Sequence, residues 1–330
     1  MTTTTAPAPT TAAPGRGPLR GLPWVVWRRH RTFLRAALLL TVVGCALFLY
    51  QRIGVMDFLH GKGVPPGGDE KLMSEFQTRF GADFARDMEY LQYVPLVVGV
   101  FLGAPLIASE QEHGTLKLVT TQSVSRSRWL AATLGLPLAV AVGCSALLSA
   151  VFTWVWTPVH GLAVSGDWLT GGAFEATGPV PAARTLFLAS CGIALGMLIK
   201  RVVPAMAATA FVGVATSVVW GERLRGHLAA VRSVTSPYDG DGPNLPFDAA
   251  RFDDWVSTAD GKLYGFGTCV SPDSAADRAC RAKLGIVNRV IQYFDYDQMA
   301  GMQWLGAAVL VALAALVLAF VVWRTRRRPL

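Results

Sequence analysis

The densest run of charged and hydrogen-bonding side chains in this sequence is SEQEHGTLKLVTTQSVSRSRW, residues 109–129, between two long apolar segments. It holds two carboxylates, an imidazole and a series of hydroxyl and amide groups. Carboxylates and hydroxyls at this density can form ion pairs and hydrogen bonds with a partner. A connection between two helices needs only about two to eight residues. A longer and more polar run indicates a surface that contacts another molecule.

The local pattern predicts a short helix inside this run. Gly114–Thr115 can end one helix and begin another, because Gly permits the turn and Thr supplies an N-cap oxygen. The next residues, LKLVTTQ, make about two helical turns, and Ser125 can cap the helix that follows. We therefore predict a short helix lying across the end of a bundle. The residues on its flank are Glu110, Glu112 and His113.

The composition indicates the class of protein to which residues 109–129 belong. Of the 330 residues, 52% are hydrophobic and 16% are charged, whereas soluble domains are about a quarter charged. The chain is therefore predicted to be a membrane protein rather than a soluble enzyme. Its first residues, MTTTTAPAPTTAAPG, have no apolar core. We predict that residues 1–20 are a disordered cytoplasmic tail without a cleavable signal peptide, so that the first span is an uncleaved anchor.

Uncharged stretches bounded by charged residues predict an all-α polytopic membrane protein with six transmembrane helices. A helix crosses the bilayer with about 20 apolar residues. Residues 185–219 as one helix would reach roughly 50 Å, so a hairpin at KRVVP divides them into two spans. The predicted spans are residues 36–52, 90–109, 129–155, 185–199, 202–220 and 302–323.

The placement of charge gives these spans a direction. The N-terminus, the 109–128 loop, Lys200–Arg201 and the tail 324–330 together hold fifteen basic and two acidic residues. The remaining segments hold fifteen basic and twenty acidic residues. Basic residues concentrate on the cytoplasmic side of membrane proteins. Both termini are therefore predicted to be cytoplasmic, and the net charge of +8 reflects topology rather than nucleic-acid binding.

Two longer segments are predicted on the outer side. Residues 54–90 carry apolar side chains mostly three or four apart, so this segment either caps the bundle or lies along the outer leaflet. These apolar positions are Leu72, Met73, Phe76, Phe80, Phe84 and Met88. Residues 221–301 form a large outer loop, rich in Pro, Gly and Asp and then helical from about Ala275 to Tyr293. The loop is either a lid or vestibule, or a segment that only stabilises the bundle.

The cysteines divide between the two environments. Cys45, Cys144 and Cys191 fall inside predicted spans, where a thiol behaves as a small hydrophobe. Cys269 and Cys280 both fall in the outer loop. An oxidising outer compartment favours a disulfide between them, and the alternative is two free thiols.

The predicted spans hold few side chains that could bind an ion or catalyse a reaction. They hold no Asp, Glu, Lys or His, and the five histidines of the chain are scattered without metal-ligand spacing. No G-x-x-x-x-G-K-[ST] motif for ATP is present. Pairs of small residues, Gly99 with Gly103 and Gly192 with Gly196, allow helices to approach closely. They mark either a dimer seam or packing within one bundle.

The stretch EQEHGTLKLVTTQSVSRSRWL resembles the loop after the second span in ABC transporter permeases, specifically the exporter-type membrane subunits common in actinobacteria. Members carry Glu-x-x-x-Gly-Thr followed by Thr-Gln-Ser-Val-Ser/Thr-Arg-x-Arg-Trp-Leu. VVWRRHRTFLRAALLL is similar to their Trp-Arg-x-His-Arg start of the first span, and the six-span layout and RRR ending agree. QYFDYDQMAGMQWL lacks the Pro and Arg usual before their last span, so no role is transferred to it.

The resemblance implies that residues 109–128 form a coupling helix that docks into a separate ATP-binding subunit. Glu110 and Glu112 would pair with basic residues of that subunit, and Gly114–Thr115 would set the turn. The implied coupling residues are Glu110, Glu112, His113, Gly114, Thr115, Thr121, Gln122, Ser123, Arg126 and Arg128.

The resemblance further implies an amphipathic connecting helix at residues 21–35, lying at the inner membrane interface. The alternative is a plain positively charged anchor for the first span. The implied interfacial residues are Trp24, Trp27, Arg28, Arg29 and Arg31.

The leading hypothesis is the permease subunit of an ATP-driven ABC exporter in a bacterial plasma membrane. It would work with a second permease subunit, as a homo- or heterodimer, and with cytoplasmic ATPase subunits that carry ATP and Mg²⁺. The chain itself would be no enzyme and would hold no cofactor or metal. Spans without charge favour an apolar or amphipathic substrate.

Two other classes of function are open. One is a non-transport sensor or scaffold whose outer loop binds a ligand. The other is a membrane enzyme that acts on lipids through residues 221–301. The enzyme would need an acid–base or metal cluster there, and His227 is the only histidine in that segment.

Overall fold

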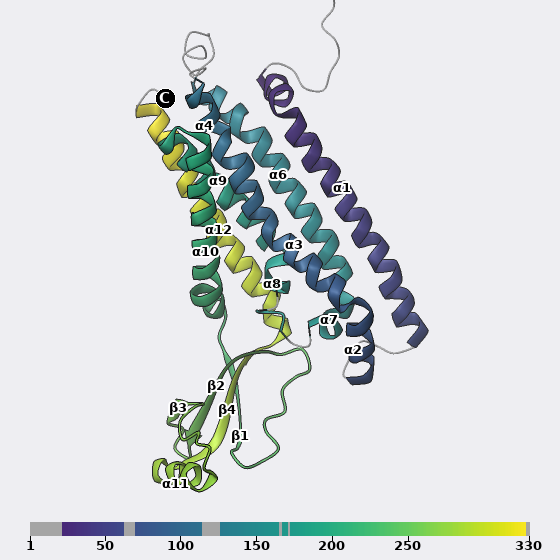
Figure 1. The fold of residues 1–330 in the computed structure, drawn as a ribbon, viewed down its shortest axis with the longest axis vertical. Coiled ribbons are helices and arrows are strands. Elements are labelled where there is room, and N and C mark those ends of the chain that lie inside the picture. The colour runs from purple at the N-terminus through teal and green to yellow at the C-terminus, as the bar shows by residue number, and fades with distance from the viewer. Residues whose placement is uncertain (1–21, 63–69, 114–125, 165–166, 171, 328–330) are drawn as a thin grey trace, which may run out of the picture.

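The computed structural model describes residues 22–62, 70–113, 126–164, 167–170 and 172–327 (Figure 1). Within them, six helices are long and apolar enough to cross a membrane, which confirms the predicted number. The candidate spans are His30–Lys62, Lys71–Glu112, Ala131–Ala163, Val180–Ile199, Val202–His227 and Tyr296–Arg327. The predicted disordered tail, residues 1–20, lies outside the described residues.

The first span belongs to a single helix, α1 (Leu22–Lys62). The predicted connecting helix at residues 21–35 is therefore not a separate element, which corrects the expectation from the sequence. The physical reason is local: Pro23 stands in the first turn, and no Pro or Gly follows until Gly44. A helix of 41 residues is about 60 Å long, twice the thickness of the hydrocarbon core.

The second span is built from α2 (Glu70–Phe76), η1 (Gln77–Gly81), α3 (Ala82–Val98), η2 (Gly99–Gly103) and α4 (Ala104–Glu112). The segments η1 and η2 are π-helical turns. Pro95 lies inside α3, and η2 begins four residues later. A proline removes one backbone hydrogen bond of the helix. A π-turn shifts the hydrogen-bond pattern of the residues that follow, so the helix continues through the irregularity.

The amphipathic stretch in this span caps one end of the bundle. Its apolar residues form an aromatic cluster with α1 and α6 (Arg126–Trp156). The ring centroids of Phe58 and Phe76 are 5.9 Å apart, and those of Phe84 and Phe152 are 6.1 Å apart. The residues of the stretch that are buried are Leu72, Phe76, Phe80, Phe84 and Met88. This burial decides between the two alternatives, because a helix along the leaflet would leave these side chains exposed to lipid.

Helix α9 (Val180–Ile199) occupies the centre of the bundle. It contacts α3, η2, α4, α6, α10 (Val202–Val219) and α12 (Tyr296–Arg327), whereas α1 contacts chiefly α6. The hairpin between α9 and α10 is confirmed: Lys200 caps α9 with φ of 63° and Arg201 is extended. The remaining short helices are η3 (Thr157–Val159), α7 (His160–Val164), α8 (Ala173–Ala176), η4 (Trp220–Leu224) and η5 (Arg225–His227).

The paired glycines pack α9 against the second span. A Cβ added at Gly192 would lie 2.5 Å from the carbonyl oxygen of Gly99. One added at Gly103 would lie 2.6 Å from the carbonyl oxygen of Ala189. Both distances are too short for a real contact, so glycine is required where the two backbones meet. These pairs therefore serve packing within one chain.

The all-α prediction is wrong for residues 232–294, which fold into a four-stranded antiparallel sheet. Its strand order is β1 (Arg232–Pro237), β4 (Ile286–Phe294), β2 (Ala250–Thr258), β3 (Leu263–Gly265). The helix expected from Ala275 to Tyr293 is α11 (Ser274–Leu284), which ends at Gly285 with φ of 69°. Gly285 stops the helix, and the β-branched and aromatic residues of IVNRVIQYF favour a strand.

Side-chain contacts stabilise this sheet domain and attach it to the helical bundle. Cys269 and Cys280 form a disulfide that joins α11 to the loop before it, with Cα atoms 5.5 Å apart. His160 of α7 stacks on Tyr296 at the start of α12, and its Nε2 lies 3.4 Å from Oδ2 of Asp248. The indole N–H of Trp168 donates to the backbone oxygen of Asp248 at 3.0 Å. The loop before β2 is therefore held on the helical bundle.

Figure 1 shows the ends of the bundle clearly. The start of α1, the end of α4, the α9–α10 hairpin and the end of α12 lie at one end, which we call the loop end. The sheet lies at the opposite end, which we call the sheet end. The described parts of the four basic segments assigned to one side by charge therefore do lie together.

Candidate functional site

At the loop end, Glu112 connects two spans. Its Oε2 accepts a hydrogen bond from the backbone N–H of Val202 at 2.9 Å. Val202 is the first residue of α10, so the carboxylate satisfies one of the free amides at the helix N-terminus and lies at the positive end of the helix dipole. The end of α4 is thereby fixed to the start of α10.

Glu110 does not lie where the resemblance implies. Only 2% of the residue is exposed, so its carboxylate does not lie on the surface of the described chain. The reason is its position on α4: with Ile107 and Ala108 it lies on the buried part of the helix, against α9 and α10. His113 is exposed, and its Nδ1 lies 2.7 Å from the backbone oxygen of Ser109. His113 thus closes the last turn of α4.

The other implied coupling residues fall largely outside the described part of the chain. Gly114, Thr115, Thr121, Gln122 and Ser123 are all outside it, as is the predicted short helix. Arg126 and Arg128 are in the first turn of α6. The structure therefore places the two borders of the 109–128 loop at the loop end.

The interfacial residues implied at the start of α1 share its first three turns. Trp24 is 47% exposed, and the guanidinium of Arg28 lies 5.4 Å from the centre of its ring. Arg31 is exposed and Trp27 is half-buried, while Arg29 is described only as a helical position. Exposed Trp and Arg side chains side by side suit a membrane interface.

A polar cluster of three charged residues lies toward the sheet end. Nη1 of Arg184 on α9 lies 2.8 Å from Oε2 of Glu175 on α8, and Nη1 of Arg225 on η5 lies 3.9 Å from Oε1 of Glu175. Arg184 also donates to the hydroxyl of Ser217 on α10. The side chains of Glu175, Arg184 and Arg225 are 7%, 12% and 13% exposed. The cluster therefore joins α8, α9, α10 and η5 by buried charge.

The position of Glu175 depends on Gln303 of α12. Nε2 of Gln303 donates to the backbone oxygens of Phe174 and Thr177, both at 3.1 Å. Gln303 itself is buried. The amide satisfies carbonyl groups at the end of the one-turn helix α8, which would otherwise be buried without partners. Glu175 is thereby held facing Arg184.

This cluster borders a cavity of about 360 Å³ between α3, α9 and α10. The volume is within the range of small-molecule sites. One part of the wall is polar, and the other is apolar. The polar residues are Gln92, Glu175, Arg184, Ser217 and Arg225, and the apolar ones include Leu96, Leu188, Val214 and Val218.

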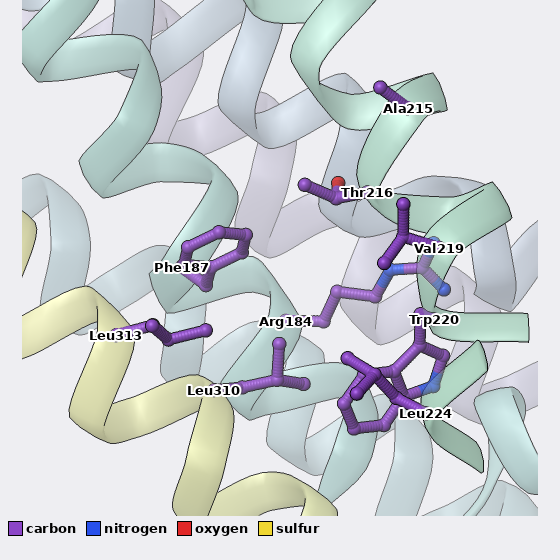
Figure 2. Close-up of a pocket in the computed structure, with 9 residues that line it drawn as sticks. All are labelled: Arg184, Phe187, Ala215, Thr216, Val219, Trp220, Leu224, Leu310 and Leu313. Carbon is purple, nitrogen blue, oxygen red and sulfur yellow. The ribbon is translucent and has the colours of Figure 1, made fainter. Parts of the chain in front are cut away.

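A second, apolar hollow of about 250 Å³ lies on the other side of α10, between it and α12. Figure 2 shows Arg184 reaching from α9 towards Val219 and Trp220, with Phe187 of the same helix and Leu310 and Leu313 of α12 on the other side of the hollow. The side chain of Arg184 therefore lines both hollows, and α10 separates them.

Sequence reasoning missed the polar cluster. The predicted fourth span began at Thr185, so Arg184 was left among the outer residues, and Glu175 was taken as part of a loop. The signal was present in the sequence: each is a single charge within an apolar stretch, GGAFEAT and PVPAARTLF. An isolated charge with apolar neighbours on both sides is usually paired inside the protein. Among the described residues, no group of three or more His, Cys, Asp or Glu could hold a metal ion.

One protein family matches this chain. A family described as ABC-2 membrane transporter related matches residues 38–225, which is more than half of the chain and runs from the first span through the fifth. Comparisons with curated proteins and with solved structures gave no match.

Proposed function

The chain belongs to the ABC-2 membrane transporter related family, and on that basis we propose that it is the permease subunit of an ATP-driven ABC exporter. The chain is an ABC-2 type permease, and in the proposal it is a membrane subunit without catalysis of its own. In the proposal, cytoplasmic ATPase subunits bind ATP and Mg²⁺, and a second permease subunit completes the transporter. The single observation that carries the proposal is the family match, which includes the whole 109–128 loop.

The proposed topology has the loop end in the cytoplasm and the sheet end outside a bacterial plasma membrane. Two observations support it. The described parts of the basic segments lie together at the loop end (Figure 1), as the positive-inside rule requires. The disulfide lies in the sheet domain, and disulfides persist in oxidising compartments outside the cytoplasm.

In the proposal, the 109–128 loop contacts the ATPase subunit and transmits its movement to the spans. The loop follows α4 directly, and Glu112 links the end of α4 to the start of α10. ATP binding then shifts the permease between two conformations because the closed ATPase dimer binds one of them more tightly. In the proposal, loop residues such as Thr121 and Gln122 supply the contacts, while Glu112 binds the first amide of α10 and Glu110 is buried within the chain.

Co-purification from the native membrane tests this proposal. The tagged chain is compared with a Thr121→Asp/Gln122→Asp variant, which adds two charges to the proposed contact. The matched control is Arg326→Gln, an exposed change at the same end of the bundle but outside the loop. We expect an ATP-binding subunit with the unchanged chain and the control, and its loss with the loop variant. Intact chain that carries no ATPase subunit would contradict the proposal.

A second candidate, a sensor or scaffold, draws on one observation. Residues 232–294 fold as a sheet with its own disulfide-linked helix, which suits a ligand-binding domain. The same co-purification separates the two: a sensor recruits a signalling protein in place of an ATPase subunit.

A further inference from the structure

We propose that the cavity between α3, α9 and α10 binds an amphiphile with an anionic headgroup. The headgroup lies against the guanidinium groups of Arg184 and Arg225, and the apolar chain lies along Leu96, Leu188 and Val214. The inference that this ligand is the substrate of an exporter rests on the proposed function. The inference that the cavity binds it rests on the geometry of the cavity alone.

The charges on the side chains that line the cavity do not cancel, although Asp167 and Glu222, outside the lining, also act on the charge of Arg225. Arg184 and Arg225 carry two positive charges, and among the described lining residues Glu175 is the one carboxylate. Arg184 donates to both Glu175 and Ser217. In the described part of the chain, Arg225 forms an ion pair with Glu175, whose Oε1 lies 3.9 Å from its Nη1, which is too far for a hydrogen bond. A guanidinium has five N–H donors. No nitrogen of Arg225 is both fully buried and without a partner, so its donors can bind an acceptor that enters the cavity. A phosphate or carboxylate in the cavity supplies such an acceptor.

The wall of the cavity changes from polar to apolar along the bundle. Helix α3 offers Gln92 and, one turn farther from the sheet end, Leu96; α9 offers Arg184 and then Leu188. On α10, Val214 lies one turn farther from the sheet end than Val218 and Ser217. Residues four apart lie on one face of a helix. Three helices therefore place polar groups at one level and apolar groups at the next, which matches a headgroup and the chain attached to it.

The cavity opens sideways. Tyr93, Val214 and Val218 line it and are 50%, 55% and 58% exposed. These side chains belong to two neighbouring spans, so the opening faces the surroundings of the bundle. A chain longer than the cavity can continue there among the acyl chains of the membrane.

Other occupants match only part of this wall. A small free anion satisfies Arg225 but leaves the apolar part uncovered, and a neutral apolar molecule leaves the excess positive charge without a partner. A helix of a second copy covers the opening but brings no charge to Arg225 unless it carries a buried acid. An anionic amphiphile matches the charge, the polarity gradient and the sideways opening together.

Photo-crosslinking tests the proposal. The chain alone is placed in nanodiscs of phosphatidylcholine with a trace of phosphatidic acid that carries a diazirine on its acyl chain. The comparison probe is phosphatidylcholine with the same diazirine chain. We expect phosphatidic acid to label the segments around Leu96 and Val214 about tenfold more than the choline lipid does, because charge-assisted hydrogen bonds of this kind discriminate by at least that factor.

Paired variants make the test specific. Arg225→Gln should reduce labelling by phosphatidic acid to the choline level, whereas Arg223→Gln, an exposed arginine on η4, should leave it unchanged. Val214→Trp should block the cavity, whereas Ala215→Trp fills the hollow on the other side of α10 and should not. Glu175→Gln raises the excess charge and should increase labelling. This opposite effect separates lost binding from a misfolded variant.

Four outcomes would overturn the proposal: equal labelling by both lipids, labelling unchanged in Arg225→Gln, full competition by millimolar inorganic phosphate, or chain-to-chain crosslinks at Val214 that show a second copy in the opening. The assay contains no ATPase subunit. If labelling fails while the ATPase subunit still co-purifies, only this inference fails. If labelling succeeds and no ATPase subunit co-purifies, the exporter proposal fails and the site remains.

Discussion

The ring of His160 stacks on the ring of Tyr296, with centroids 3.9 Å apart and planes inclined by 10°. His160 begins α7, Tyr296 begins α12, and Asp248 on the loop before β2 contacts the same histidine. One histidine therefore joins the sheet domain to two parts of the bundle.

Replacing this histidine should loosen the sheet domain without unfolding the spans. His160→Ala removes an aromatic contact that contributes about 0.5–1.5 kcal/mol. We expect hydrogen exchange in residues 246–252 to accelerate several-fold, up to about tenfold, as measured by mass spectrometry. The control is His227→Ala, an exposed histidine toward the same end. Unchanged exchange in His160→Ala would show that the stacking does not hold the domain.

Glu112 should stabilise the spans even without any partner subunit. Glu112→Ala removes the acceptor at the N-terminus of α10 and should lower the free energy of unfolding by about 0.5–2 kcal/mol. Glu112→Gln keeps an acceptor but loses the charge, so its effect should be smaller. Thermal unfolding of the chain in detergent measures both. A loss of ATPase binding without any loss of stability would instead make Glu112 a contact residue.

The glycines between α9 and the second span should not accept a methyl group. Gly192→Ala places a Cβ against the carbonyl oxygen of Gly99 and should destabilise the chain by about 1–3 kcal/mol. Gly143 of α6 has nothing within 4 Å of an added Cβ, so Gly143→Ala should be neutral or stabilising by up to about 1 kcal/mol. Equal effects at the two positions would contradict this account.

The buried pair of Arg184 and Glu175 should show strong coupling. Arg184→Gln leaves the carboxylate of Glu175 with only the distant Arg225, and we expect a loss of about 3–5 kcal/mol. The double variant Arg184→Gln/Glu175→Gln should lose less, because it removes both charges. A double-mutant cycle on unfolding measures the coupling, and additive losses would mean that the pair contributes no interaction.

Removing the disulfide should affect the sheet domain alone. Cys280→Ser frees a short loop and should cost about 2–4 kcal/mol by the chain-entropy account, seen as faster proteolysis around α11. Cys144→Ser, within α6, is the control and should leave the proteolysis unchanged. Reduction of the unchanged chain should reproduce the effect of Cys280→Ser.

The sequence predicted those parts of the fold that depend on one dominant physical signal. Six apolar stretches predicted six spans, because crossing hydrocarbon requires continuous apolar helix. The KRVVP hairpin followed from the length of the stretch and from the charged pair Lys200–Arg201 within it. The phenylalanines of residues 72–88 gave the helical spacing, but only their burial against Phe58 and Phe152 showed that they cap the bundle.

The sequence was insufficient where distant residues decide the outcome. The strand Ile286–Phe294 is paired on both sides by segments about 35 to 55 residues earlier, and no local pattern reveals that pairing. Glu175 and Arg184 came from segments read as a loop and a span border, so their pairing was not considered. The role of Glu110 was transferred from a resemblance, and a resemblance in sequence does not state which face of α4 is buried.

Helix α10 is held at both ends by side chains from other elements. At the loop end Glu112 binds its first amide, and near the sheet end Arg184 binds its Ser217. Between them the helix has 18 residues, about 27 Å of rigid rod, with a hollow on either side. Such a rod moves as one piece. A displacement of the end of α4 would therefore shift α10 along its axis. Arg184, which binds Ser217 of α10, would be the first cavity residue to be displaced.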